Sequence, residues 1–442
     1  MELREARAWL DAHADLFDAL AGVPSGRTPR RMAPAPLSRM EALIELLGSP
    51  QLQYPSIHIT GTNGKTSTAR MTTALLVSAG LSVGTDTSPY LQRLNERMSW
   101  NGEPIADEEL DRILVLLADV EPLLADRPSY MEIINAAAFE WFADIAVDVA
   151  VIEVGLGGRW DATNVVDGRV AVVTNVEIDH VEYLGPTRRG ISEEKAGIVK
   201  PGSILVLGET DPELVPIFTD RNPERVVTRG VDFGVSANAL ALGGRLVDLF
   251  TPYASYPDLF VPLHGAHQAD NAAAALAAAE CFLERPLGFD VVSDAFASVS
   301  SPGRLEVVGY NPLVVIDGTK NVAGARAVRA ALDEEFPRAQ RTWVIGVLRQ
   351  KDAHEMLDAL GVGELDRVIC CRPEIPRARD PEEVADAARA LGVDPENVEV
   401  IDGVAAAVRH AIDTSEPDDQ VVVAGSLYVA GPARSALVSE TD

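Results

Sequence analysis

The sequence predicts an α/β fold with two domains, and three observations support that prediction. Strand-like apolar runs alternate with helix-like amphipathic runs along nearly the whole chain, a pattern typical of parallel sheets covered by helices. At 442 residues the chain is too long for one hydrophobic core. The alternation also restarts after "SVSSPGR" (298–304), which we interpret as a linker. We therefore expect an N-terminal domain over residues 1–299 and a smaller C-terminal domain over residues 300–442.

The elements expected in the N-terminal domain follow in order. The expected strands are 54–60, 82–87, 147–154, 168–176 and 203–208. The expected helices are 65–80, which ends at Gly80, 106–124, in which Asp107 is the expected N-cap, 132–146, 192–199 and 267–284. Between residues 225 and 262 the pattern shortens to small β elements.

The C-terminal domain shows a second complete alternation. Its expected strands are 312–318, 341–347, 365–371 and 420–426. Its expected helices are 323–336, 353–360, 381–391 and 403–412. This part of the chain therefore predicts a Rossmann-like α/β domain of its own.

Composition excludes several classes of function. The chain carries 38 basic and 67 acidic residues, a net charge of −29, which argues against a nucleic-acid partner. Its longest nearly unbroken apolar stretch, "AAAALAAAECFL", is too short and too weakly apolar to span a membrane. The N-terminus carries acids and lacks the apolar region of a signal peptide. Three cysteines, two of them the adjacent Cys370 and Cys371, favour a reducing compartment, so we expect a cytoplasmic protein.

Lysine is rare in this sequence, and its positions are informative. The five lysines are Lys65, Lys195, Lys200, Lys320 and Lys351, and arginine supplies every other basic residue. High-GC codon bias explains the excess of arginine but not where the lysines fall. Lysine offers a compact charge with an adjustable pKa, so these positions are mild indicators of chemistry.

The stretch "HITGTNGKTST" (58–68) predicts a nucleotide-binding loop between a strand and a helix. Gly61 and Gly64 allow the backbone to turn its N–H groups toward phosphate oxygens, and the helix adds its positive end. Lys65 would reach the β and γ phosphates, and Thr66 could ligate Mg²⁺. The match is incomplete, because Ile59 stands where the strict pattern has glycine.

Two later strand ends add candidate polar groups. The buried strand in "VDVAVIEVGLGGRWDATN" ends at Glu153, where an acid suits Mg²⁺ in a phosphoryl-transfer site better than it suits simple strand capping. Asp179 and His180 follow the next strand, although a lone histidine is more often structural. Lys195, taken alone, looks like a solvated helix charge.

These segments together resemble the folylpolyglutamate synthase and dihydrofolate synthase family of the Mur ligase superfamily. The resemblance covers nearly the whole chain and rests on segments that stand in the family's order: "GTNGKTS", "TSPYLQRLNERM", "EVGLGGRWDATN", "TNVEIDHVEYLG", "EKAGIVK", "HQADNAAAA", "PGRLE" and "AGSLYVAG". No single segment is specific, but the combination is. It implies a P-loop-containing Mur-ligase-type domain followed by a glutamate-ligase α/β domain.

The resemblance implies ATP-dependent amide ligation. ATP would phosphorylate the carboxylate of dihydropteroate or of a (poly)glutamylated tetrahydrofolate, and the amine of L-glutamate would attack the acyl phosphate. ADP and phosphate would be released. An acyl phosphate hydrolyses easily, so a cleft between two domains should exclude water. The implied partners are ATP, L-glutamate and a pterin or folate, and we expect a monomer.

The resemblance also implies roles for individual residues. The catalytic group would be Lys65, His180 and Lys195, of which Lys195 matches a lysine that can be carbamylated and then support a second Mg²⁺. The metal ligands would be Ser88, Glu153 and His180, together with Thr66. The ATP contacts would be Gly61, Thr62, Asn63, Gly64, Lys65, Thr66, Ser67, Asn271, Arg304, Asp317 and Lys320. The pterin segments would be Tyr130, Met131 and Glu132, and Trp160, Asp161 and Ala162. Asn271 could otherwise be a helix cap and Arg304 a linker salt bridge.

The sequence departs from the family pattern at several positions. Tyr90 stands where histidine is usual, and Thr66 where glycine is commoner. In "DGTKNVAGA", Thr319, Lys320, Asn321 and Val322 replace Ala-His-Asn-Pro. Lys320 thus replaces a histidine expected to meet ATP phosphate, and it can supply positive charge there.

Three alternatives remain open at this point. One is a Mur-like ligase for another amino acid or acceptor. Another is a non-catalytic ATP-binding homologue, prompted by the altered "DGTKNV". The third is a plain P-loop kinase or NTPase, against which His180, Lys195 and a second α/β domain argue.

Overall fold

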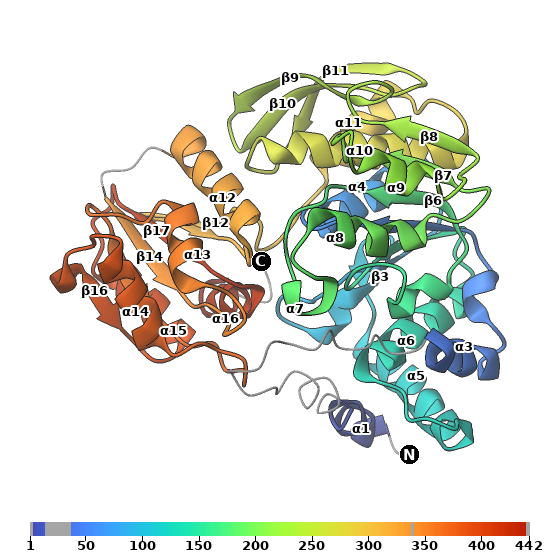
Figure 1. The fold of residues 1–442 in the computed structure, drawn as a ribbon, viewed down its shortest axis with the longest axis horizontal. Coiled ribbons are helices and arrows are strands. Elements are labelled where there is room, and N and C mark those ends of the chain that lie inside the picture. The colour runs from blue at the N-terminus through green and yellow to red at the C-terminus, as the bar shows by residue number, and fades with distance from the viewer. Residues whose placement is uncertain (1–2, 14–36, 337–339, 439–442) are drawn as a thin grey trace.

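An eight-stranded sheet organises the N-terminal part of the chain (Figure 1). The computed structural model describes residues 3–13, 37–336 and 340–438. The strand order is β4-β3-β2-β5-β1-β6-β7-β8. The strands are β1 (Ser56–Thr60), β2 (Val83–Asp86), β3 (Met98–Trp100), β4 (Glu103–Pro104), β5 (Val149–Glu153), β6 (Gly168–Val173), β7 (Ile204–Leu207) and β8 (Arg225–Thr228). In this order, each pair of neighbours from β2 through β5, β1, β6 and β7 to β8 is parallel. At the other edge, β3 pairs antiparallel with β2, and β4 pairs antiparallel with β3.

Helices cover both faces of this sheet. Side chains alternate along a strand, so Val149 and Val151 of β5 enter one core while Ala150 and Ile152 enter another. The helices are α1 (Ala6–Asp11), α3 (Leu37–Leu46), α4 (Lys65–Ser78), α5 (Asp107–Val120), α6 (Tyr130–Asp144), α7 (Val181–Leu184), α8 (Arg188–Lys195), α9 (Val215–Thr219), α10 (His267–Leu283) and α11 (Phe289–Ala297). The first core contains residues of α4, α10 and α11, and the second contains residues of α3, α5 and α6.

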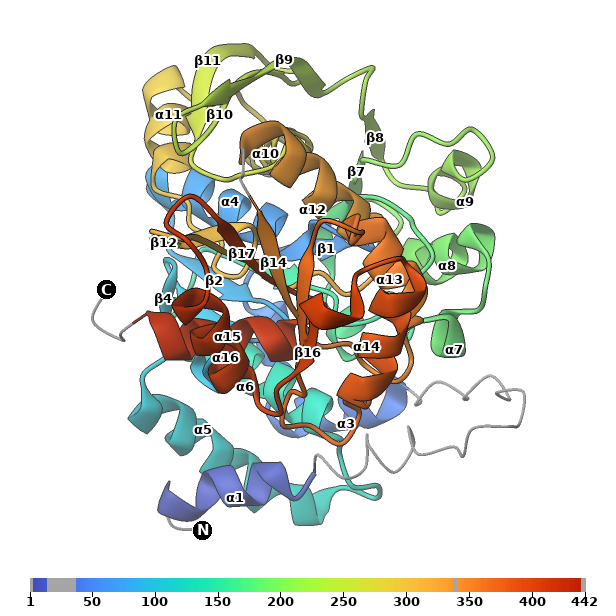
Figure 2. The same cartoon turned by 90° about the vertical axis from the view of Figure 1, so that its left-hand side faces the viewer.

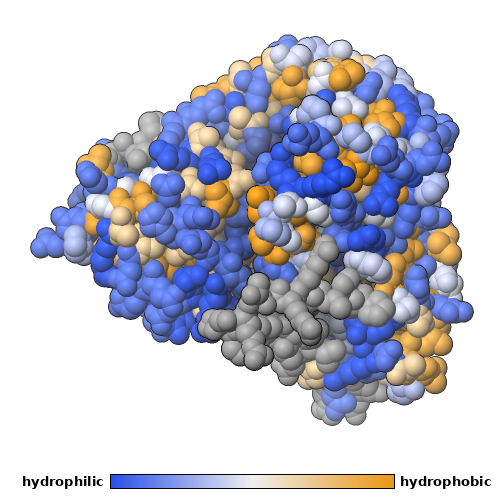
Figure 3. All heavy atoms as spheres, in the orientation of Figure 1, coloured by the Kyte–Doolittle hydropathy of each residue, from blue (hydrophilic) through white to orange (hydrophobic). Residues whose placement is uncertain are grey.

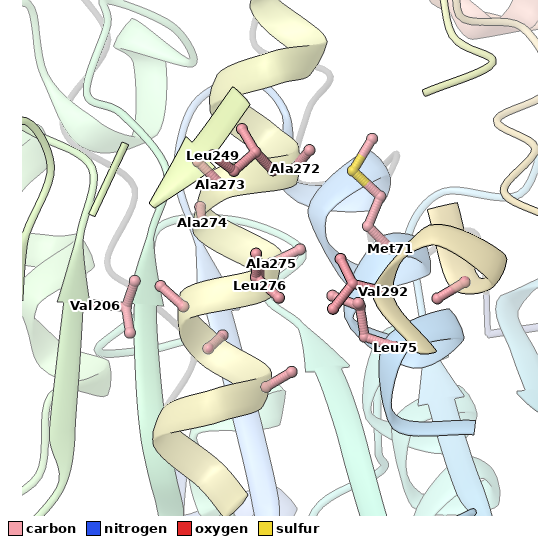
Figure 4. Close-up of a cluster of buried hydrophobic side chains, with 14 of the residues drawn as sticks. Met71, Leu75, Val206, Leu249, Ala272, Ala273, Ala274, Ala275, Leu276 and Val292 are labelled. Carbon is pink, nitrogen blue, oxygen red and sulfur yellow. The ribbon is translucent and has the colours of Figure 1, made fainter. Parts of the chain in front are cut away.

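The alanine-rich helix α10 packs closely on α4 (Figure 4). Ala272 to Ala275 are buried beside Leu276, and Met71 and Leu75 of α4 lie in the same core. Small side chains let the helices approach, and the residues around them fill the remaining space. This packing holds the start of α10 beside the nucleotide-binding loop.

A three-stranded antiparallel sheet lies next to α10 and α11. Its strands are β9 (Gly234–Ala241), β10 (Gly244–Phe250) and β11 (Ser255–Val261), in the order β11-β10-β9. The short β elements expected between residues 225 and 262 are thus confirmed, with β8 joining the large sheet.

The C-terminal part forms a separate six-stranded sheet with helices on both faces (Figure 2). Its order is β12-β13-β17-β14-β15-β16, and only β12 pairs antiparallel. The strands are β12 (Glu306–Tyr310), β13 (Leu313–Ile316), β14 (Arg341–Ile345), β15 (Arg367–Cys370), β16 (Val398–Val400) and β17 (Gln420–Ala424). The helices are α12 (Val322–Glu335), α13 (Ala353–Leu360), α14 (Pro381–Ala390), α15 (Val404–Asp413) and α16 (Leu427–Leu437). The predicted α/β class is confirmed, while the boundary between residues 299 and 300 stays a prediction.

Two local expectations were wrong. Asp107 is the first residue of α5, and Ala106 occupies the cap position without a side-chain hydrogen bond. The helix expected over 192–199 instead begins at Arg188, because the Thr187 side chain accepts the N–H of Gly190, and it gives way to a 3₁₀ turn after Lys195.

One face of the molecule is mainly hydrophilic (Figure 3), as the charged residues of the sequence predict. Hydrophilic side chains dominate the face shown in Figure 3, and apolar ones form small separate groups. Among the described residues, no helix is both long and apolar enough to cross a bilayer.

Candidate functional site

The nucleotide-binding loop joins β1 to α4, and two glycines are required in it. Gly61 has φ +154°, and a Cβ there would lie 1.8 Å from the Thr174 hydroxyl. Gly64 has φ +81°, and a Cβ there would lie 2.2 Å from Oδ1 of Asn271. Each position combines a backbone conformation that favours glycine with a neighbour that leaves no room for a side chain. The loop therefore closes tightly over the C-terminal end of β1.

Glu153, Thr66 and Ser88 lie together at this edge of the sheet. The Thr66 hydroxyl donates to the Glu153 carboxylate at 3.0 and 3.1 Å, and the Ser88 N–H donates to it at 3.1 Å. Burial raises the pKa of Glu153, an effect that the nearby Lys65 opposes. A buried carboxylate beside two hydroxyl side chains is a hard-oxygen donor set of the kind that Mg²⁺ prefers.

Three lysines line a small cavity of about 10 Å³ beside the loop. Lys65 donates to the Gly61 carbonyl at 3.2 Å, and Lys195 donates to the same carbonyl at 2.7 Å. Lys195 is 3% exposed, and burial followed by the charge of Lys65 lowers its pKa well below the usual value. The site therefore favours the neutral amine of Lys195, which is the form that can accept CO₂.

His180 lines this cavity together with the three lysines. Burial lowers the pKa of His180 to about 3, with Asp179 opposing and Lys320 adding to the shift. The imidazole is thus neutral, the form that ligates metals. No hydrogen bond among the described residues joins it to Glu153, Ser88 or Thr66, and the larger cavity described below is lined by both His180 and Ser88.

Lys320 lines the small cavity from the C-terminal domain. It lies between Asp317, after β13, and Asn321, the N-cap of α12. Asp317 accepts the N–H groups of Leu305 at 2.9 Å and Thr319 at 2.7 Å, which shapes the loop. Burial and then Lys65 lower the pKa of Lys320 to about 8. Lys320 therefore lies beside the nucleotide-binding loop, where it lines the same cavity as Gly61, Thr62 and Lys65.

The remaining ATP candidates surround the same loop. Asn271 lies inside α10 and faces Gly64, so it is not a helix cap. Arg304 forms no salt bridge among the described residues, and its side chain lies against Gly318. Thr62 exchanges hydrogen bonds with the backbone of Glu177, and Ser67 lies 3.3 Å from the hydroxyl of Ser301.

A larger cavity of about 610 Å³ adjoins the small one. The two share lining residues, namely Gly155, Leu156, Gly157, His180, Leu184 and Lys320. The expected pterin residues Met131, Glu132, Trp160, Asp161 and Ala162 line it, whereas Tyr130 does not. The Asp161 carboxylate is oriented by the N–H groups of Leu156 and Thr163, at 2.8 and 3.0 Å.

Sequence reasoning gave no role to five cationic side chains that line the larger cavity, among them Arg97 and Lys351. Arg97 is buried, and it donates to Asn135 at 3.1 Å and to the Met131 sulfur at 3.3 Å. Lys351 reaches from the loop after β14 and pairs with Asp179. The scarcity of lysine was a signal for Lys351, while Arg97 was hidden inside the segment "TSPYLQRLNERM".

No three His, Cys, Asp or Glu side chains in the described ranges are grouped to hold a metal ion.

Two family models match the chain. The Mur ligase middle domain matches residues 59–279, and the glutamate ligase domain of Mur ligases matches residues 303–427. A dihydrofolate synthase/folylpolyglutamate synthase of Mycobacterium tuberculosis is 39% identical, over 92% of this chain and 91% of the relative.

Solved structures agree with this match. A folylpolyglutamate synthase of Mycobacterium tuberculosis complexed with ADP superposes with a TM-score of 0.87 at 37% identity, and covers 98% of this chain and 99% of its own. A bifunctional enzyme of Yersinia pestis, complexed with AMPPNP and a Mn ion, gives a TM-score of 0.81 at 28% identity and covers 96% and 98%. The chain belongs to the folylpolyglutamate synthase/dihydrofolate synthase family of Mur ligases, whose members are ATP-dependent glutamate ligases.

Proposed function

We propose that this ligase joins L-glutamate to the carboxylate of dihydropteroate, of (poly)glutamylated tetrahydrofolate, or of both. The observation that carries the proposal is the meeting of two cavities at Lys320 and His180. One is the lysine-lined pocket of the nucleotide loop, and the other is large enough for a pterin and its benzoate, since small-molecule pockets typically reach about 300–1,000 Å³.

The reaction has two steps that this arrangement supports. An oxygen of the acceptor carboxylate attacks the γ-phosphorus of ATP, the bond to the bridging oxygen breaks, and ADP leaves. The amine of L-glutamate then attacks the acyl carbon, phosphate leaves, and the amine loses its proton. Lys65 and Lys320 place positive charge where the transferring phosphoryl group develops negative charge.

Two groups of residues fit Mg²⁺. Thr66, Glu153 and Ser88 would hold one ion, and His180 with a carbamylated Lys195 would hold another. Bound Mg²⁺ supplies charge neutralisation at the phosphates. The burial of Lys195, which lowers the pKa of its amine, supports the modification, because a carbamate forms only from the uncharged amine.

We also propose a monomer in a reducing compartment such as the cytoplasm. Cys281, Cys370 and Cys371 are free and buried, and burial raises the pKa of each thiol. They are thus poorly suited to disulfide formation.

ADP release with a panel of acceptors tests the function. Dihydropteroate, tetrahydrofolate, a muramyl peptide and no acceptor would each be supplied with ATP, L-glutamate and Mg²⁺. We expect ADP release only with a pterin acceptor. Equal turnover without an acceptor would indicate an NTPase, turnover only with the muramyl peptide a cell-wall ligase, and none at all a non-catalytic homologue.

A further inference from the structure

Asp179 joins the two halves of the molecule. Its carboxylate is 5% exposed and belongs to the loop after β6 of the large sheet. Two groups of the C-terminal domain reach it: the Lys351 ammonium pairs with Oδ1, and the Asn321 amide donates to Oδ2 at 3.0 Å. One acid of the N-terminal domain thus receives a charged and a neutral donor from the other domain.

The amide of Asn321 has every hydrogen-bonding group in use. Its nitrogen donates to Asp179 and also, at 3.0 Å, to Oδ1 of Asn63 in the nucleotide loop. Its oxygen accepts the N–H of Gly324 at 2.8 Å and so caps α12. A primary amide has two N–H groups, and both are directed at the N-terminal domain. The start of α12, and the adjacent Lys320, are therefore tied to the loop that holds ATP.

The other end of α12 is tied to the three-stranded sheet instead. The buried Arg245 of β10 donates to Glu334 at 3.0 Å and to Glu335 at 2.9 Å, in the last turn of α12. Glu335 also accepts the N–H of Gly265 at 2.8 Å. With this end anchored, loss of the Asp179 contacts would free the end of α12 that lies beside the two cavities.

Asp179 supplies the negative charge that offsets the positive charges of the lysines around it. It is the only acidic side chain among the described residues that line the small cavity, and Lys65, Lys195 and Lys320 line that cavity with it. Four of the chain's five lysines thus either line this cavity or pair with Asp179. Without it, positive charges from the two domains would face each other and repel.

We propose that Asp179 is a positioning residue that fastens the C-terminal domain to the nucleotide-binding loop through Lys351 and Asn321. This closure keeps water from the activated acceptor, so the proposal rests on the proposed function for its activity readout. When the closure loosens, water attacks the acyl carbon, phosphate leaves, and the acceptor carboxylate is regenerated. ATP is then consumed without amide formation.

The test measures ADP and amide separately in Asp179→Asn, Lys351→Met and the double variant. Misplacement of this kind should lower the rate of amide formation on the order of a hundredfold. The ratio of ADP to amide should rise in both single variants, and the double variant should be no worse than the worse single one, because both changes break one contact. Glu334→Gln removes an interdomain ion pair away from the cavities and should keep the parent ratio.

Small-angle X-ray scattering with AMPPNP provides a readout that needs no turnover. Asp179→Asn and Lys351→Met should be more open than the parent and Glu334→Gln. Parent-like scattering together with a parent-like ratio, or additive effects in the double variant, would overturn the proposal. Failure of the parent itself to form amide from a pterin acceptor would instead overturn the proposed function, and the scattering would still decide the role of Asp179.

Discussion

Glu153 is the residue on which the proposed metal site depends most. Its carboxylate receives the Thr66 hydroxyl and the Ser88 N–H, and no Lys or Arg in the described ranges forms an ion pair with it. Glu153→Gln keeps the shape but removes the charge, so turnover should fall by about a hundredfold or more, or about 3 kcal/mol. Steady-state kinetics and circular dichroism check this, and near-parent turnover in a folded variant would contradict the role.

Lys195 is buried, and its amine donates a hydrogen bond to the Gly61 carbonyl at 2.7 Å. It is therefore not a solvent-exposed helix charge. If its carbamate supplies the working carboxylate, Lys195→Ala should be nearly inactive. A short carboxylate added to the assay should restore part of the activity, while the parent should gain nothing. Mass spectrometry of the parent under CO₂ checks for the modification itself. Full activity of the alanine variant would rule the carbamate out.

Lys320 should make the activity of the enzyme depend on pH, and the groups around Lys320 determine whether activity rises or falls with pH. Burial and Lys65 lower the pKa of Lys320 to about 8, so its charge is present below that pH and lost above it. The value of kcat/KM for ATP reports the free enzyme and should fall as pH rises through about 8.

Matched variants separate Lys320 from other ionising groups. Lys320→Arg should lose less activity above pH 8 than the parent, since arginine keeps its charge. Lys320→Ala should raise KM for ATP and lower kcat, and Lys320→His should retain much of the activity near pH 6.5 but lose it by about pH 8. An alanine variant with unchanged kinetics would place Lys320 outside the reaction.

The helix α10 offers a test at the scale of an element. Ala275 is fully buried in the core shared with α4, where a larger side chain has no space. Ala275→Leu should therefore destabilise the protein by about 1–3 kcal/mol, measured by urea denaturation. Ala330→Leu, on the exposed face of α12, is the control and should change stability little. Equal stability of the two variants would contradict the close packing.

Most of the elements around the site were predictable because their patterns are local. Parallel strands end at one edge of a sheet, so Gly61 after β1 and Glu153 at the end of β5 had to lie near each other. The helices that were missed include α7, which has only four residues, α11, which precedes the predicted linker, and α3 and α16, which line the larger cavity. Helices of such lengths are stabilised by tertiary packing more than by their own periodicity.

Contacts between the domains were beyond the reach of sequence patterns. Asp179 and Lys351 are 172 residues apart, and no sequence motif around either residue indicates that the two are in contact. The meeting of His180 with Lys65, Lys195 and Lys320 in the small cavity, and the absence of Tyr130 from the lining of the large one, likewise depend on how the loops pack. The family resemblance could assign His180 and Tyr130 to the functional site, but it could not say which of the two cavities, if either, each residue lines.

At the scale of the whole molecule, the eight-stranded and six-stranded sheets belong to separate parts of the molecule (Figures 1 and 2). Residues from both parts line two adjoining cavities. The N-terminal domain supplies the nucleotide loop and Lys195, and the C-terminal domain supplies Lys320 and Lys351. In the proposed reaction, positive charge comes from both domains, and their closure would keep water from the acyl phosphate.

Transfer of a carboxylate oxygen from acceptor to phosphate tests this account most directly. Dihydropteroate in which both carboxylate oxygens are a heavy isotope would be incubated with ATP, Mg²⁺ and L-glutamate, and the products analysed by mass spectrometry. The account predicts that the inorganic phosphate released with each amide contains one labelled oxygen, because that oxygen bridges carbon and phosphorus in the acyl phosphate. Amide formation with unlabelled phosphate would contradict it.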